Sequence, residues 1–184
     1  MTIEIDQKTV LKIINLKTYF FLDTGTIKAV DGINLTINKG ETLGIIGESG
    51  CGKSVTAHSI LKLIPSPPGK IISGKIILHH NDKFTDITKL DNSDKRLRNI
   101  RGNNIGMIFQ EPMTSFGPLH TIGNQIIESI LIHKKVQNET EAKNIAINLL
   151  KVVGIPNPEK RILSYPHEFS GGMRQRAMIA MALA

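Results

Sequence analysis

The first half of the chain alternates apolar and polar positions in a way that predicts β-strands. We expect strands at residues 10–16, 32–37, 42–47, 73–80 and 105–109. Segment 42–47 (TLGIIG) is almost entirely apolar, which is typical of a strand buried on both faces. Apolar spacing predicts a helix at 54–64, ended by the proline cluster that follows, and a short polar helix at 93–101.

The second half of the chain has helical spacing. Ile122, Ile126, Ile130 and His133 predict one helical face. The next helix has Asn138 and Glu141 spaced as a capping box and Gly154 at its C-terminal end, and the last helix begins at Ser170 and reaches Ala184 with no cap. This order predicts an α/β core with a helical insertion. The uncapped last helix looks like a truncation, and the core sheet is expected to lack strands after residue 184.

Composition narrows the class of protein. The 184 residues are 40% hydrophobic and include one cysteine, Cys51, which excludes a disulfide framework and fits a reducing compartment. The chain starts without a signal-peptide core and has no apolar run of about 20 residues, so we expect a soluble, cytosolic protein. The net charge of +7 is spread along the chain, and aromatic residues are 4% with no tryptophan. A positive charge suggests nucleic acid or an anionic membrane surface as a partner, but the scattered basic residues favour neither, and the few aromatic residues further disfavour nucleic acid.

One motif carries clear chemistry. Residues 47–54 match the pattern G-x-x-x-x-G-K-[ST] in full, between a predicted strand and a predicted helix. Glycines let successive backbone N–H groups converge on phosphate oxygens at the positive end of the helix. Lysine at this position reaches the β- and γ-phosphates, and the serine hydroxyl is a Mg²⁺ ligand. We therefore predict binding of ATP and Mg²⁺ by Gly47, Glu48, Ser49, Gly50, Cys51, Gly52, Lys53 and Ser54.

A second motif starts the last helix. Ser170 is followed by Gly171 and Gly172, so the first turn of this helix lacks side chains. Glycine costs stability there, and close approach of an anion to the bare N–H groups would explain its presence. A flexible loop leading into a surface helix is the alternative explanation.

Three motifs in this order, GESGCGKS (47–54), IFQEPMTS (108–115) and YPHEFSGGMRQR (165–176), resemble the ATP-binding subunits of ABC transporters. The resemblance runs from about residue 10 to Ala184. Within the family, the three motifs are most similar to those of the dipeptide and oligopeptide importers. It implies one domain over 1–184 with the P-loop NTPase fold: an N-terminal β-subdomain, an incomplete parallel core sheet, and a helical subdomain with the Q-loop within about 105–184. IPSPP (64–68) and GPLHTIG (117–123) are similar to the peptide and microcin type.

The resemblance also implies roles for individual residues. Gln110 stands where the family has its Q-loop glutamine, a contact to Mg²⁺ and the attacking water. Ser170, Gly171, Gly172 and Gln175 match the signature that binds the ATP held by the opposite subunit. The family stacks adenine on an upstream aromatic residue, and Phe20 is our choice from the cluster Tyr19, Phe20 and Phe21, because Leu16, Thr18 and Phe20 share one strand face. Core packing is the alternative role for each of these aromatic side chains.

This sequence departs from the family pattern in two ways. Phe169 replaces the leucine usual before the signature serine. The family continues with a strand ending in Asp-Glu, and no Asp-Glu pair is present here, so we assign no catalytic residue and expect no ATP hydrolysis by the 184 residues alone.

The resemblance finally implies a setting in the cell. It implies a peripheral subunit on the cytoplasmic side of the cell membrane, which hydrolyses ATP when complete to drive uptake of peptides or related solutes. Its partners would be membrane-spanning permease subunits, a second nucleotide-binding domain and, indirectly, a solute-binding protein. The alternatives are a fragment that binds nucleotide without hydrolysis, and a nucleic-acid-acting ATPase of the same superfamily.

Overall fold

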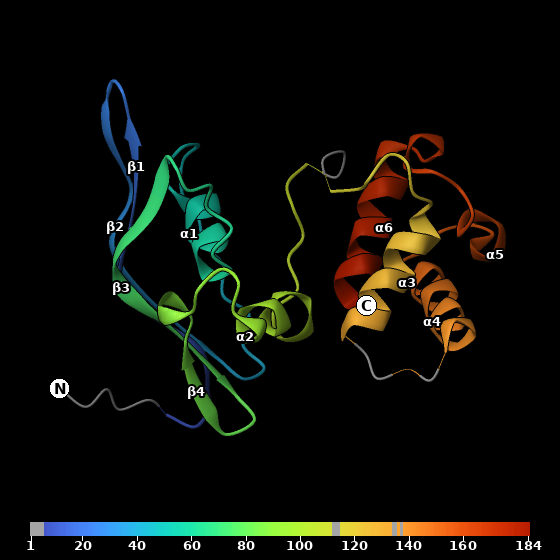
Figure 1. Ribbon diagram of the computed structural model, residues 1–184, viewed down its shortest axis with the longest axis horizontal. Coiled ribbons are helices and arrows are strands. Elements are labelled where there is room, and N and C mark those ends of the chain that lie inside the picture. The colour runs from blue at the N-terminus through green and yellow to red at the C-terminus, as the bar shows by residue number, and fades with distance from the viewer. Residues whose placement is uncertain (1–5, 112–114, 134–135, 137) are drawn as a thin grey trace. The chain divides into compact units, whose positions relative to one another are not determined.

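The computed structural model describes residues 6–111, 115–133, 136 and 138–184 of the chain. Two compact units follow one another along the sequence, residues 1–98 and 99–184 (Figure 1). The first unit contains the strands and one principal helix, and the second contains most of the helices. Each unit has buried apolar residues of its own.

The N-terminal unit is built on a four-stranded antiparallel sheet in the order β2-β1-β3-β4. The strands are β1 (Thr9–Leu22), β2 (Gly25–Asn38), β3 (Gly69–His80) and β4 (Lys83–Asp86). The predicted strands at 10–16, 32–37 and 73–80 are confirmed. β1 and β2 are longer than their apolar runs predict, because hairpin pairing continues to the Leu22–Gly25 turn and holds the polar positions in the ladder.

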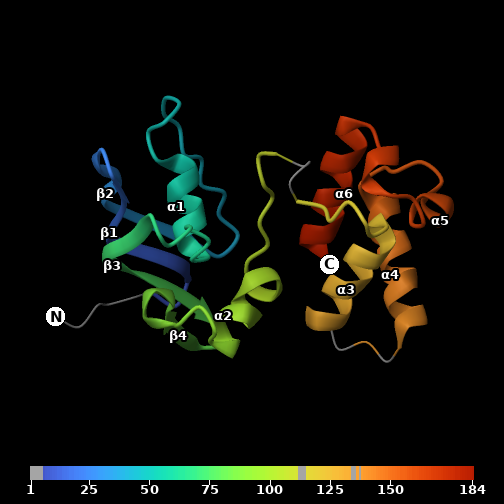
Figure 2. The same ribbon diagram turned by 45° about the horizontal axis from the view of Figure 1, so that its top comes forward.

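One face of this sheet is apolar and packs toward helix α1 (Lys53–Ile60), which Figures 1 and 2 both show alongside the sheet. Ile13 of β1 stands opposite Leu35 of β2 and Ile76 of β3, and Leu16 and Thr18 are buried on the same face. Leu11 and Ile13 alternate, as do Leu16 and Thr18, and the register shift between Ile13 and Leu16 keeps both pairs on the same face. The unit continues with the short helices η1 (Ile87–Lys89) and α2 (Lys95–Asn99), the second of which spans the boundary between the units.

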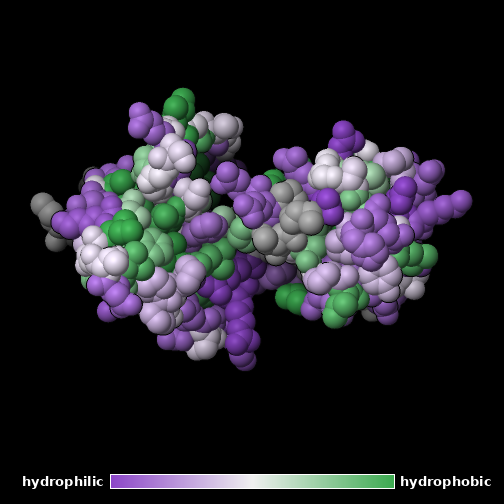
Figure 3. Space-filling model, turned by 90° about the horizontal axis from the view of Figure 1, so that it is seen from above, coloured by the Kyte–Doolittle hydropathy of each residue, from purple (hydrophilic) through white to green (hydrophobic). Residues whose placement is uncertain are grey.

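Two of the predicted strands are wrong. Residues 42–47 and 105–109 have no strand assignment, apart from an isolated bridge between Arg101 and Ile105. The expected buried strand 42–47 is exposed, with Leu43, Ile45 and Ile46 at 41%, 51% and 99%. A strand needs neighbours to satisfy its N–H and C=O groups, and among the described residues no strand lies beside either segment. Figure 3 shows hydrophobic surface, in green, interspersed over the face seen from above.

The C-terminal unit is a helical cluster that begins with the π-helical turn η2 (Ile100–Asn104). Its main helices are α3 (Ile122–His133), α4 (Glu139–Val152) and α6 (Gly171–Leu183), joined by the short helices α5 (Pro158–Arg161) and η4 (Pro166–Glu168). Ile122, Ile126 and Ile130 are fully buried, which confirms the predicted face of α3. Ala142, Ala146 and Leu150 of α4 and Ala177, Met178 and Ala180 of α6 complete this core.

The predicted helix caps are confirmed. The Asn138 side chain accepts a hydrogen bond of 2.9 Å from the backbone N–H of Glu141. Gly154 follows α4 with a φ of +75°, the left-handed conformation that glycine adopts without strain. The Ser170 hydroxyl accepts from the N–H of Met173 at 3.3 Å and so begins α6.

Candidate nucleotide-binding site

Residues 47–54 form a loop that leads into the first turn of α1, which begins at Lys53. Gly50 and Gly52 have φ values of +84° and +93°, so the loop turns through two left-handed residues. A Cβ atom on Gly52 would lie 2.2 Å from the carbonyl oxygen of Ala29, so glycine is required there by space as well as by φ. The backbone of Gly52 thus packs directly against β2, which fixes the start of α1 against the sheet.

The Lys53 side chain folds back over this loop. Its Nζ donates to the carbonyl oxygens of Gly47 at 2.7 Å and Glu48 at 2.6 Å, and lies 3.4 Å from the Sγ of Cys51. The ammonium group is therefore held at the mouth of the loop by backbone oxygens, which are weaker partners than ionised phosphate oxygens. The predicted contact of Lys53 with the β- and γ-phosphates of ATP stays a prediction.

The N-terminus of α1 suits an anion. Its N-cap, Gly52, offers no side-chain cap, and its first turn contains no acidic residue. The first N–H groups of a helix lack intrahelical acceptors and carry the positive end of the helix dipole. Ser54 is exposed in this turn, as a metal-binding hydroxyl must be. Its role as a Mg²⁺ ligand stays a prediction, and the described residues contain no cluster of three His, Cys, Asp or Glu side chains that could hold a metal without phosphate oxygens.

Buried hydroxyl groups anchor α1 to the sheet, and sequence reasoning missed them. Thr56 Oγ1 donates to the Gly52 carbonyl at 3.0 Å, and Ser59 Oγ donates to the Val55 carbonyl at 2.7 Å. Thr18 Oγ1 of β1 lies 2.9 Å from Ser59 Oγ in the interior. The signal in the sequence was a threonine between Leu16 and Phe20, where the inward face of β1 would otherwise be apolar.

The aromatic cluster 19–21 separates onto the two faces of β1. Phe20 is half-buried, and its ring lies beside Gly69, where an added Cβ would be 2.9 Å from Cε1. Phe21 is 51% exposed. Tyr19 donates its hydroxyl to Asp31 at 2.7 Å, and Lys28 lies over its ring. Phe20 thus shares the α1 side with Leu16 and Thr18, as predicted, and its contact with adenine stays a prediction.

Charged groups beside Tyr19 shift one another's protonation. The Tyr19 hydroxyl, and then the Lys17 ammonium 3.2 Å away, stabilise the Asp31 carboxylate and lower its pKa from the usual value. The same hydrogen bond raises the pKa of Tyr19. Asp31 therefore stays ionised at neutral pH and balances part of the positive charge of the strand pair.

The signature residues lie at the N-terminus of α6 in the C-terminal unit. Ser170, Gly171, Gly172 and Gln175 are all exposed, and a Cβ on either glycine would meet no atom within 4 Å. Packing within this chain therefore does not require the two glycines, and the helix presents a bare, positively polarised end. Phe169 is 3% exposed in the helical core, so the aromatic ring is accommodated next to an unchanged serine cap.

Gln110, the predicted Q-loop residue, lies on the surface, close in sequence to residues outside the described part of the chain. It is exposed and follows a segment that forms no strand, which corrects the expectation that it ends one. Residues 112–114 of the same motif lie outside the described part of the chain. Gln110 and the signature belong to the C-terminal unit and Lys53 to the N-terminal unit, so the predicted joint site of Ser54 and Gln110 for Mg²⁺ stays a prediction.

The fold and the loop geometry agree with the comparison to known proteins. The model of the family described as ABC transporter matches residues 30–184, and the chain belongs to this family. Its fold is that of the family's ATP-binding cassette: the dimeric structure of MJ0796, a bacterial ABC transporter cassette, superposes with a TM-score of 0.80 at 27% identity, over 95% of this chain and 69% of that one. A second structure of MJ0796, described as a post-hydrolysis state bound to ADP and Pi, gives 0.79.

Among curated proteins, this chain is similar to ATP-binding proteins of peptide transporters. The oligopeptide transport ATP-binding protein OppD of Bacillus subtilis is 52% identical over 93% of this chain and 45% of its own length. The dipeptide transport ATP-binding protein DppD of the same organism is 48% identical over 95% of this chain and 50% of its own length. The chain thus spans about half the length of the curated relatives it matches. Among the described residues, none of the helices is both long and apolar enough to cross a bilayer.

Proposed function

We propose that this chain is the nucleotide-binding part of an ATP-binding subunit that powers import of peptides or related small solutes. The observation that carries the proposal is the position of the Lys53 ammonium group, held at the mouth of a glycine loop by the Gly47 and Glu48 carbonyls. Two relatives that are 52% and 48% identical, OppD and DppD, are named for oligopeptide and dipeptide transport. Their names support peptides as the substrate class.

Lys53 performs the first step of the mechanism. Its Nζ exchanges two neutral carbonyl acceptors for the β- and γ-phosphate oxygens of ATP, which are charged and bind an ammonium group more strongly. The N–H groups at the start of α1 add directed hydrogen bonds without any side-chain movement. Ser54 would hold Mg²⁺, together with Gln110, and the ion neutralises charge on the phosphates when it is bound.

The signature residues act on a second nucleotide. Ser170, Gly171 and Gly172 present exposed N–H groups at the end of a 13-residue helix, where an incoming γ-phosphate meets no side chain. We infer that this phosphate is held by a second nucleotide-binding domain and that Gln175 contributes to the same contact. Phe20 would stack on adenine at the edge of β1. Membrane-spanning permease subunits are the further partners, with a solute-binding protein acting through them on the other side of the membrane.

The 184 residues are expected to bind ATP without turning it over. The sequence contains no Asp-Glu pair, the residues that would organise Mg²⁺ and polarise the attacking water. The proposed location is the cytoplasmic face of the membrane, as a peripheral subunit.

Titration of a fluorescent ATP analogue tests the proposal. Lys53→Ala should weaken binding about tenfold or more, because a charge-assisted hydrogen bond contributes about 1.5–3 kcal/mol. Lys39→Ala removes an exposed lysine from the same unit, away from the loop, and should bind like wild type. Equal affinity of wild type and Lys53→Ala would overturn the phosphate-loop assignment.

A further inference from the structure

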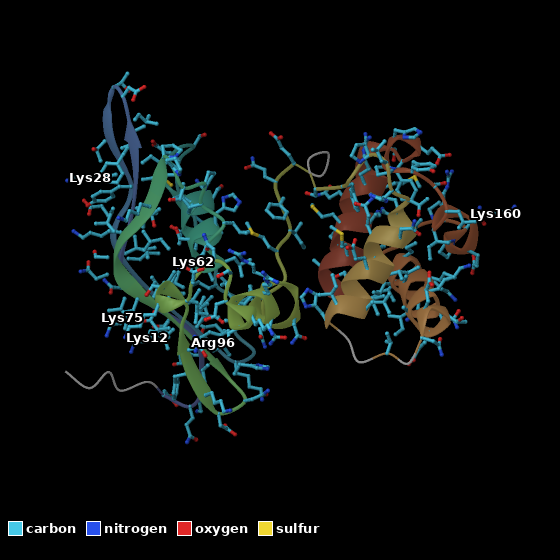
Figure 4. The ribbon with its side chains drawn as sticks, in the orientation of Figure 1. Lys12, Lys28, Lys62, Lys75, Arg96 and Lys160 are labelled. Carbon is cyan, nitrogen blue, oxygen red and sulfur yellow. The ribbon has the colours of Figure 1, made fainter. Side chains whose placement is uncertain are left out.

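Five lysines gather on the sheet face that points away from α1. Strand register defines the face: Lys12 stands opposite Thr36 and Ile77, and Lys75 stands opposite Ile14. Figure 4 shows Lys12, Lys28 and Lys75 on the side of the sheet away from α1. We call this surface the basic sheet face, and its lysines are Lys12, Lys17, Lys28, Lys70 and Lys75.

Acidic side chains balance this charge only in part. By register, Asp31 and Asp86 lie on the same face, opposite Lys17 and Ile77. Asp31 is engaged by Tyr19 and Lys17, and Asp86 accepts two hydrogen bonds from Thr88, at 3.2 Å from its N–H and 2.6 Å from its hydroxyl. Among the described residues of this face, five lysines therefore stand with two aspartates, which leaves an excess of positive charge.

Apolar side chains lie among the lysines at the two ends of the face. Phe21, Phe84 and Val10 are 51%, 49% and 37% exposed. The ring of Phe84 stacks on His79 with centroids 4.4 Å apart. A broad surface of lysines with exposed apolar side chains at its margins has the composition of an interfacial membrane contact, in which charged groups meet headgroups and apolar groups enter the boundary.

We propose that the basic sheet face binds the surface of a bilayer that contains anionic phospholipids. The charge complementarity of lysine ammonium groups and lipid phosphates supports this occupant. A single-stranded nucleic acid would need neighbouring aromatic rings for successive bases. Tyr19 and Phe21 lie two residues apart on this face, but Lys28 lies over the Tyr19 ring. Phe84 lies about 11 residues of β1 away from Phe21, or roughly 35 Å of strand, so the described residues of this face offer no row of open rings. The proposal goes beyond nucleotide binding, because none of these lysines belongs to the phosphate loop.

Vesicle sedimentation tests the proposal on the 184-residue chain. Vesicles of phosphatidylglycerol and phosphatidylcholine should bind the protein, pure phosphatidylcholine vesicles should not, and raising the salt should release it. Each lysine near such a surface contributes about fivefold to the partition coefficient. The triple variant Lys12→Gln, Lys28→Gln, Lys75→Gln should therefore bind on the order of 100-fold more weakly.

A matched variant has the same change in charge elsewhere. Lys143→Gln, Lys151→Gln, Lys160→Gln replaces exposed lysines of the helical unit and should bind anionic vesicles like wild type. Circular dichroism checks that both triple variants fold. Lys53→Ala should also bind vesicles like wild type, so that a failure of the vesicle test and a failure of the nucleotide-site assignment can be told apart. Equal loss in the two triple variants, or tighter binding to a single-stranded oligonucleotide than to the vesicles, would overturn the proposal.

Discussion

The hydroxyl groups of Thr18 and Ser59 lie 2.9 Å apart inside the N-terminal unit and join β1 to the helix that follows the phosphate loop. Ser59 donates its own proton to the Val55 carbonyl, so its oxygen accepts from Thr18. Thr18 is therefore the donor and Ser59 the acceptor. Removing the acceptor leaves a buried donor unsatisfied, whereas removing the donor does not.

This direction predicts unequal effects on stability. Ser59→Ala leaves the buried Thr18 hydroxyl without an acceptor, which costs about 1–3 kcal/mol. Thr18→Val keeps the shape and leaves Ser59 bonded to Val55, so the cost is about 1 kcal/mol. Urea denaturation of both variants measures the difference. A larger loss for Thr18→Val than for Ser59→Ala would show that the bond does not have this direction.

Gly52→Ala is expected to damage both stability and nucleotide binding. The new Cβ would lie 2.2 Å from the Ala29 carbonyl oxygen, so either the loop or β2 must move. Gly50→Ala is the matched control, because its φ is also positive but no atom lies within 4 Å of the new Cβ. Gly50→Ala should cost about 1–2 kcal/mol from backbone conformation alone. Equal denaturation midpoints for Gly52→Ala and Gly50→Ala would contradict the packing argument.

Alkylation of Cys51 should block the site. Cys51 is exposed, and its Sγ lies 3.4 Å from Lys53 Nζ, so a maleimide there occupies the space that the phosphates require. MgATP should slow the labelling in return, because bound phosphates cover the loop. Mass spectrometry reports the reaction without ambiguity, since Cys51 is the only cysteine in the sequence. Labelling at the same rate with and without MgATP, in folded protein, would place Cys51 away from the phosphates.

The purified 184 residues should show no ATP hydrolysis above background. The phosphate loop would position the nucleotide and Gln110 would contact the attacking water, but the sequence contains no Asp-Glu pair to polarise that water. A coupled phosphate-release assay with wild type and Lys53→Ala measures this. ATP hydrolysis by wild type that disappears in Lys53→Ala would contradict this prediction. It would show that another residue of the chain acts as the general base.

Segments 42–47 and 105–109 should exchange their amide hydrogens quickly. Neither segment belongs to a strand, and Ile46 is 99% exposed, so apart from the Ile105 N–H, which donates to the Ile100 carbonyl, we expect little protection of their N–H groups. Peptides that cover residues 11–16 should exchange far more slowly, because β1 is paired on both sides. Peptides of α6 around Ala177 and Met178, which are buried, should also be slow. Equally slow exchange in 42–47 and β1 would mean that the segment finds a partner in solution.

Local features were predictable from the sequence. The caps at Asn138 and Ser170 each depend on a side chain and an N–H group three residues away, so the sequence spacing contains the geometry. The α3 face of Ile122, Ile126 and Ile130 follows from helical period alone. The phosphate loop belongs to the same class, because Lys53 contacts carbonyls only five and six residues before it.

Features that join distant segments were decided by the tertiary structure. The Thr18–Ser59 bond spans 41 residues, and the clash that reserves position 52 for glycine comes from Ala29 on another strand. Segment 42–47 has the composition of a buried strand and is nevertheless exposed, because apolar character cannot supply the backbone partners that a strand requires. Sequence determined what folds through neighbours in the chain: the loop, the caps and the helix faces. The pairing of β1 with β3 depends on hydrogen bonds between segments far apart in the sequence, and only the assembled structure decides that those bonds form.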